Sequence, residues 1–157
     1  MGRIEASTTI RAPIDDVFRY IADGENSPEW HPTIIEAKRI MGTELGVGST
    51  VLYRARIGFL ELAWVTRAVE FEWNKRFRDV LVKVVRGPLK SYELIGEFEE
   101  IGRGTLVRLE LYYELGWGPL GRIVDGLIIM SRVKRHMEEG LINAKAIVES
   151  KFGGGIA

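Results

Sequence analysis

The feature that most constrains this fold is a run of strand-like segments that follow one another through the middle of the chain with very short breaks. The segments expected to be strands are 34–40, 49–57, 60–73, 76–86, 90–99 and 105–115. The breaks contain residues typical of tight turns, as in Gly58-Phe59, Asn74-Lys75 and Gly87-Pro88. Strands joined by such short turns run antiparallel, because parallel neighbours need a long crossover connection. The sequence therefore predicts an antiparallel meander.

The alternation of apolar and polar residues indicates a sheet with one buried face. In the last segment Val107, Leu109 and Leu111 point to one side, while Arg108 and Glu110 point to the other. The stretch near the N-terminus, from 4 to 11, alternates in the same way. This period of two residues predicts one further strand at the start of the chain.

Two prolines mark the expected beginnings of helices. Pro13 follows the first strand and is well placed in the first turn of a short helix. A second, very short helix is expected around residues 27–31. After Pro119 there is no proline up to residue 150, and apolar residues recur with helical spacing. We therefore expect a C-terminal helix of roughly 30 residues with one apolar stripe.

The composition excludes several classes of protein. The 157 residues include 22 Lys and Arg, 22 Asp and Glu, two histidines and no cysteine. Without cysteine there is no disulfide framework, thiolate metal site or cysteine nucleophile. Two histidines hold zinc only if carboxylates supply the other ligands. A balanced charge argues against a nucleic-acid partner, which needs a basic face. We expect no metal and no cofactor.

The length fits a single domain. We place this domain at residues 3–150, followed by a flexible tail at 151–157 that holds three consecutive glycines. The first residues lack the apolar run of a signal peptide, and no apolar run approaches the roughly 20 residues of a membrane span. The expectation is a cytoplasmic protein without stable membrane insertion.

Three local motifs occur in a characteristic order. They are STTIRAPIDDVF at 7–18, DGENSPEWHP at 23–32 and GVGS at 46–49. The first resembles the opening strand and alanine-proline helix start of the START-like or Bet v 1-like (SRPBCC) superfamily, in particular its polyketide cyclase/dehydrase-like group. The second is similar to that group's aspartate–tryptophan–proline segment, and the third to the glycine pair before its third strand. The resemblance covers essentially the whole predicted domain.

This resemblance implies an α+β helix-grip fold. A curved seven-stranded antiparallel sheet would wrap around the long C-terminal helix, with two short helices after the first strand. The resemblance also implies a cavity between sheet and helix that holds a hydrophobic small molecule of lipid, polyketide or aromatic type. The sequence itself shows only an amphipathic sheet and an amphipathic helix that must cover one another.

Aromatic and apolar residues on these elements are the candidates for lining such a cavity. Aromatic side chains supply a large apolar area with a polar handle, which suits a ligand site, although core packing is the more ordinary role of any single tryptophan. The candidate lining residues are Trp30, Trp64, Tyr92, Phe98, Tyr113, Trp117, Leu127 and Met130, with Lys134 as a candidate polar anchor.

The inward face of the segment 60–73 is open to two interpretations. Trp64 shares the parity of the leucines before it, whereas Phe71 and Trp73 share the opposite parity. A β-bulge near Thr66-Arg67 would turn both sets inward. Without a bulge, one of the two tryptophans lies on the outer surface.

The segment 76–86 is ambiguous as well. If Phe77 and Leu81 point inward, Asp79 and Lys83 point toward the cavity too. If the even-numbered valines point inward instead, both charges stay in water. The second alternative is favoured because it leaves no unpaired charge to bury.

Three side chains are candidates for acid–base chemistry. His31 lies beside the expected pocket rim, and a histidine there can exchange protons near neutral pH, although an exposed loop position is the more ordinary interpretation. Asp79 reaches the cavity only in one of the two strand phases. Lys134 lies at the edge of the apolar helix stripe, where a lysine commonly extends to solvent.

The favoured function is therefore binding of a hydrophobic small molecule between the sheet and the long helix. One alternative is a cyclase/dehydratase-like enzyme that uses His31, Asp79 and Lys134. A second alternative is a protein-interaction module that docks through the apolar first half of the long helix, with a homodimer contact as one form. Binding is favoured over catalysis because the chain has few reactive side chains.

Overall fold

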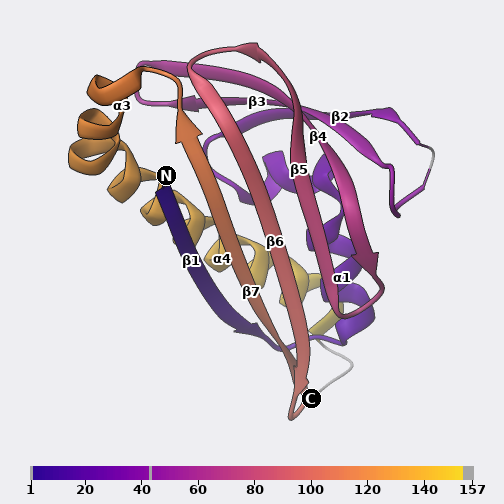
Figure 1. The fold of residues 1–157 in the computed structure, drawn as a ribbon. Helices are drawn as coiled ribbons and strands as arrows, with labels where there is room; N and C mark the ends of the chain where they lie inside the picture. Colours follow the sequence, from indigo (N-terminus) through magenta and orange to yellow (C-terminus); the bar gives the residue numbers. More distant parts are fainter. Residues whose placement is uncertain (1, 43, 154–157) are drawn as a thin grey trace.

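The predicted strands form one curved antiparallel sheet, shown in this computed structural model of the chain (Figure 1). The structure describes residues 2–42 and 44–153, apart from the side chains of residues 125 and 127. The strands are β1 (Gly2–Ile10), β2 (Ile34–Met41), β3 (Thr50–Ile57), β4 (Leu60–Glu72), β5 (Arg76–Arg86), β6 (Leu89–Ile101) and β7 (Gly104–Leu115). The order across the sheet is β1-β7-β6-β5-β4-β3-β2, so all strands except β1 follow the chain as a meander.

The helices lie at the two ends of the chain, as the sequence predicts. They are α1 (Ile14–Ala22), η1 (Gly24–Asn26), α2 (Ser27–Trp30), α3 (Gly118–Val124), η2 (Asp125–Ile129) and α4 (Met130–Phe152). The expected C-terminal helix is found as three consecutive segments, because η2 is a π-helical turn between α3 and α4. The helix-grip fold is confirmed, with α4 running behind the sheet in Figure 1. Within the described residues, no helix is long and apolar enough to cross a membrane.

The apolar stripe of α4 explains where this helix packs. Met137, Leu141, Ala144 and Val148 are all buried, and α4 contacts β1 of the sheet together with α1 and α2. Since β1 is an edge strand, α4 leaves the inner face of the central strands largely to other side chains.

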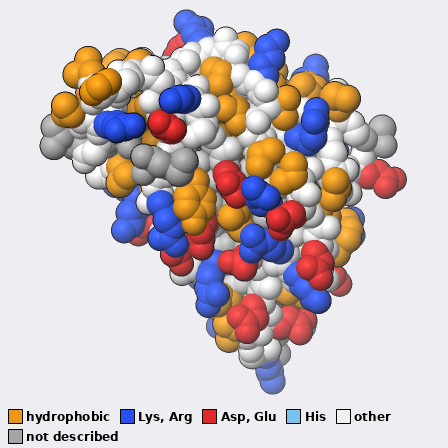
Figure 2. All heavy atoms as spheres, in the orientation of Figure 1, with side chains coloured by type: hydrophobic (Ala, Val, Ile, Leu, Met, Phe, Trp, Pro, Cys, Tyr) orange, Lys and Arg blue, Asp and Glu red, His pale blue; other side chains and the backbone are white. Residues whose placement is uncertain are grey.

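The first part of the C-terminal helical region behaves differently. Leu120, Ile123 and Ile128 are 66%, 57% and 50% exposed, and hydrophobic side chains gather over α3 at the upper left of Figure 2. The sequence predicts burial of this part on more than one side. In the described part of the chain, these apolar side chains stay partly exposed to solvent. A homodimer or another partner that covers this face stays a prediction.

Bulges settle the direction of the side chains in β4. The pairing of β4 with β5 skips Val69, which is therefore an extra residue in β4. The bulge expected near Thr66-Arg67 lies at this neighbouring position. As a result Trp64 is buried, and the rings of Phe71 and Trp73 both pack against Phe18.

The phase favoured for β5 is wrong over its first half. Phe77 and Asp79 face inward, and β5 then carries two extra residues, Val82 and Val85, relative to β4. The bulge at Val82 changes the phase, so that Lys83 is exposed. Neither alternative drawn from the sequence holds along the whole strand, because both assumed an unbroken alternation.

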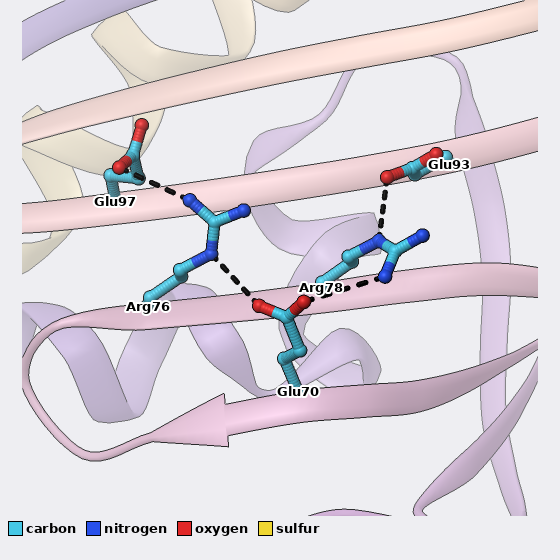
Figure 3. A network of polar contacts seen from close by, with 5 residues as sticks. All are labelled: Glu70, Arg76, Arg78, Glu93 and Glu97. Carbon is cyan, nitrogen blue, oxygen red and sulfur yellow. Dashed lines mark hydrogen bonds and ion pairs between the residues drawn. The ribbon is translucent and has the colours of Figure 1, made fainter.

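Ion pairs on the outer face of the sheet hold this phase in place (Figure 3). Arg76 contacts Glu70 of β4 at 3.0 Å and Glu97 of β6 at 3.2 Å. Arg78 contacts the same Glu70 at 3.4 Å and Glu93 of β6 at 2.6 Å. Since successive side chains of a strand alternate, outward arginines at these two positions require Phe77 and Asp79 to point inward.

The inward ring of Phe77 fits over a residue without a side chain. Gly96 of β6 pairs with Phe77, and a Cβ built on Gly96 would overlap the Phe77 ring. The ring also lies 6.0 Å from that of Phe98. Gly96 thus allows an aromatic side chain to occupy the sheet's inner surface directly over a neighbouring strand.

We predict that Gly96→Ala destabilises the fold by about 1–3 kcal/mol, because the added methyl group overpacks the core. Urea unfolding monitored by circular dichroism measures this change. The matched control is Gly126→Ala, since a Cβ at Gly126 meets no heavy atom within 4 Å. Equal stability of the two variants would contradict the prediction.

Candidate functional site

A cavity lies between the inner face of the sheet and the helices. Its walls come from β3, β4, β5, β6 and β7 on one side and from α1, α2, η2 and α4 on the other. Its volume is about 110 Å³, several times the roughly 10–15 Å³ that one water molecule requires. Most of its lining is aliphatic or aromatic, which is the usual character of a small-molecule site.

Four of the predicted lining residues border this cavity. They come from different elements: Trp30 from α2, Trp64 from β4, Tyr92 from β6 and Tyr113 from β7. The Trp64 ring lies 5.5 Å from that of Tyr53 and 5.6 Å from that of Tyr92. The aromatic residues therefore form a connected wall rather than isolated contacts.

The other predicted lining residues lie elsewhere. Phe98 belongs to the core beneath α1, with its ring 4.9 Å from that of Phe18. Trp117 lies at the surface before α3 and is 38% exposed. Met130 packs against the core outside the cavity lining. The side chain of Leu127 lies outside the described residues.

Lys134 does not reach the cavity. It is exposed and borders a shallow surface hollow with Glu5, Ser7 and Thr8 of β1 and Glu138 of α4. The physical reason is the position of α4 over the edge strand β1: the flank of the stripe that carries Lys134 faces that edge and not the centre of the sheet.

Several lining residues were not predicted, although the signal for them was present in the sequence. Tyr53 lies on the same face of β3 as Val51 and Ala55, and Leu94 lies on the same face of β6 as Tyr92. On α4, Val133 and Met137 line the cavity one turn apart. The alternation was visible, but which strands lie at the centre of the cavity depends on where α4 crosses the sheet.

Asp79 brings a carboxyl group to the apolar wall. It is the acidic member of the lining, and among the described lining residues there is no lysine, arginine or glutamate. Burial raises the pKa of Asp79 from 3.8 to about 7, without a contribution from a hydrogen bond or a cation. Burial and, after it, the negative charge of Asp79 raise the pKa of the Tyr53 and Tyr92 hydroxyls, so both tyrosines lie near Asp79.

His31 provides a second titratable group. The backbone N–H of Thr33 donates to His31 Nδ1 at 3.3 Å, which places the proton of the neutral ring on Nε2. Burial, followed by the charge of His136, lowers the pKa of His31 from 6.5 to about 4. His31 is therefore neutral at physiological pH.

His31 and Asp79 border the same cavity. The pKa shift of Asp79 comes from burial alone, and that of His31 from burial and then the charge of His136, so neither group is a cause of the other's shift. Environments that move two pKa values apart are typical of acid–base sites. Acid–base catalysis at one substrate atom, however, also needs both groups within reach of that atom.

Two tryptophans that border the cavity carry buried donors. Among the described residues, the indole Nε1 atoms of Trp30 and Trp64 are buried without an acceptor. A buried donor without a partner destabilises the protein by roughly 1–3 kcal/mol. Within the part of the chain that the structure describes, no group of three His, Asp or Glu side chains is arranged to hold a metal ion.

Comparison with known proteins agrees with this geometry. A family model described as polyketide cyclase / dehydrase and lipid transport matches residues 1–149. No curated protein matches the sequence.

Several solved structures share the fold. The protein TTHA0849 of Thermus thermophilus is 21% identical with a TM-score of 0.81, covering 95% of this chain and 98% of that one. A START superfamily protein of Mycobacterium smegmatis is 14% identical with a TM-score of 0.77 over 96% and 99%. The Zhui aromatase/cyclase of a Streptomyces species is 12% identical with a TM-score of 0.74 over 95% and 94%. At these identities the likeness concerns the fold alone.

The raised pKa of Asp79 yields a prediction for Asp79→Asn. The folded chain binds this proton more tightly than the unfolded chain, so the native carboxyl lowers stability as the pH rises from 3.8 to about 7. Relative to the native chain, we expect the variant to gain at most about 2–3 kcal/mol of unfolding free energy between pH 5 and pH 8.

Urea unfolding at the two pH values tests this difference. His31 acts in the opposite sense, because its lowered pKa adds stability as the pH rises from about 4 to 6.5, but this contribution is common to both chains and cancels. Asp16→Asn in the first turn of α1, where the side chain is half-buried outside the cavity lining, serves as the control. A pH-independent difference between native and Asp79→Asn chains would show that Asp79 is not desolvated.

Proposed function

Because the chain belongs to the polyketide cyclase / dehydrase and lipid transport family, we propose that it binds a hydrophobic small molecule in the cavity under the sheet. The observation that supports this most is the composition of the walls, with aromatic rings from β3, β4, β6 and β7 around a space of about 110 Å³. Burial of apolar ligand surface there contributes roughly 25 cal/mol per Å².

The proposed ligand is of lipid, polyketide or aromatic type. Its apolar part contacts aliphatic side chains such as Leu62, Leu94 and Leu111, which line the cavity. Its polar atoms meet polar side chains of the lining such as His31 and Asp79, since an apolar cavity with a few placed polar groups fixes ligand orientation. A cytoplasmic location, the lack of a nucleic-acid partner and a homodimer stay predictions.

Catalysis of the cyclase/dehydratase type is a second candidate. It is favoured by one observation, namely that His31 and Asp79 border the same cavity. It ranks second because, in the described part of the chain, no hydrogen bond joins the two groups, and because Lys134, the third candidate, is exposed and borders a different hollow.

Filling the cavity tests the binding function. We predict that Leu94→Trp weakens binding of the neutral lipophilic dye Nile red at least tenfold, because the larger side chain occupies the ligand's space. Fluorescence titration measures this. The matched control is Leu106→Trp on the opposite face of β7, where Leu106 is half-buried outside the cavity. Binding that is absent in the native chain, or equal in both variants, would count against the proposal.

The catalytic candidate has its own test. If His31 and Asp79 act as acid and base, His31→Gln and Asp79→Asn each lower the rate of cyclisation of a poly-β-ketone thioester about 10²–10⁴-fold. Product formation is followed by liquid chromatography and mass spectrometry. A native rate no faster than buffer, or variants as fast as the native chain, would exclude the enzyme.

A further inference from the structure

The described side chains that line the cavity carry charge of one sign only. Of the described side chains that line it, Asp79 is the group that carries a negative charge, and none is a lysine or an arginine. His31 is neutral, since its pKa is lowered to about 4. The cavity therefore has no cation to pair with a carboxylate or phosphate of a ligand, and an acidic ligand would meet a like charge in an apolar environment.

Strand pairing on both sides fixes the position of Asp79 in the cavity wall. It pairs with Ala68 of β4 and Leu94 of β6, so its neighbours on either side offer no charge. It also borders a smaller hollow of about 20 Å³ that it shares with Ser49 and Thr66. Asp79 thus borders both the main cavity and this smaller hollow.

Aromatic rings surround the same region. Tyr53 and Tyr92 are near enough for the charge of Asp79 to raise their pKa, and the Trp64 ring lies 5.5 and 5.6 Å from their two rings. Faces of aromatic rings attract cations, and this attraction grows where water is excluded. A carboxylate with aromatic neighbours suits a positively charged group attached to an apolar body.

We propose, on the basis of the binding function proposed above, that the ligand carries a protonated basic nitrogen that pairs with Asp79, so that the cavity selects apolar amines over apolar acids. Among the described lining residues the carboxyl has no lysine or arginine to pair with in the free protein. A cationic ligand that reaches it therefore gains a charge-assisted hydrogen bond. A hydroxyl in the same place can also donate a hydrogen bond to the carboxylate, but it brings no positive charge to pair with it.

Three isosteric ligands with one apolar body test this proposal: 2-(1-naphthyl)ethylamine, 2-(1-naphthyl)ethanol and 1-naphthylacetic acid. Naphthalene fluorescence and calorimetry give their affinities at pH 8, where an alkylamine is protonated. We expect the amine to bind at least tenfold more tightly than the alcohol, and the acid at least tenfold more weakly than the alcohol. In Asp79→Asn the amine loses its advantage while the affinity of the alcohol stays within about twofold. Asp16→Asn keeps the native preference.

The pH dependence of the native chain gives a readout that needs no variant. Between pH 5.5 and 8.5 the affinity for the amine rises as Asp79 ionises, and the affinity for the alcohol does not. The groups that face Asp79 are Tyr53 from β3 and Tyr92 from β6; both hydroxyls have raised pKa values and stay neutral in this range. His31, across the cavity, also stays neutral.

The outcomes separate this inference from the function on which it rests. Binding of the alcohol or the acid as tight as that of the amine overturns the amine proposal and leaves a ligand cavity in place. An amine preference that survives in Asp79→Asn, or that does not change with pH, overturns it too. If Nile red binds but none of the three naphthyl compounds does, the amine proposal fails alone. If nothing binds, the binding function fails as well.

Discussion

The direction of two arginines in β5 governs the interior of this protein. Arg76 and Arg78 both face outward, where each forms one ion pair with Glu70 of β4 and another with a glutamate of β6. A single ion pair at the surface contributes little. This network, however, spans three strands and joins two consecutive outward positions (Figure 3). The strand between them cannot rotate without breaking all four contacts, and Phe77 and Asp79 are therefore directed inward together.

The cavity follows from the same phase combined with the position of the long helix. Phe77 and Phe98 fill the end of the inner face beneath α1, and α4 covers the edge at β1. Between these two packed regions the walls are formed by Tyr53, Trp64 and Tyr92. The Trp64 ring lies 5.5 and 5.6 Å from the rings of Tyr53 and Tyr92, and all three border the cavity. The space is thus bounded by well-packed regions on both sides.

Much of the fold was predictable because periodicity is a local property of the sequence. The seven strands, the short turns, the prolines at the starts of α1 and α3 and the amphipathic C-terminal helix were all predicted from such patterns. Strand phase was predictable only where alternation was unbroken, as in β7. In β4 and β5 the phase depends on bulges at Val69, Val82 and Val85, and bulges depend on the partner strand. Lys134 and Trp117 were misplaced because the sequence does not encode the crossing position of α4 in any local pattern.

The phase of β5 also shows why a rule about single residues failed. Avoiding a buried unpaired charge favoured an outward Asp79, and the rule's energetic basis is sound, because the carboxyl does shift its pKa to about 7. Strand pairing and the core contacts of Phe77 nevertheless outweigh this cost. The desolvation that weakens the folded state at neutral pH is the same property that makes Asp79 selective for a cation. A hydrogen-bond donor beside Asp79 would stabilise the carboxylate in the free protein and, by the same amount, reduce what a cationic ligand gains on binding. Stability at neutral pH and discrimination among ligands are therefore opposed in this cavity.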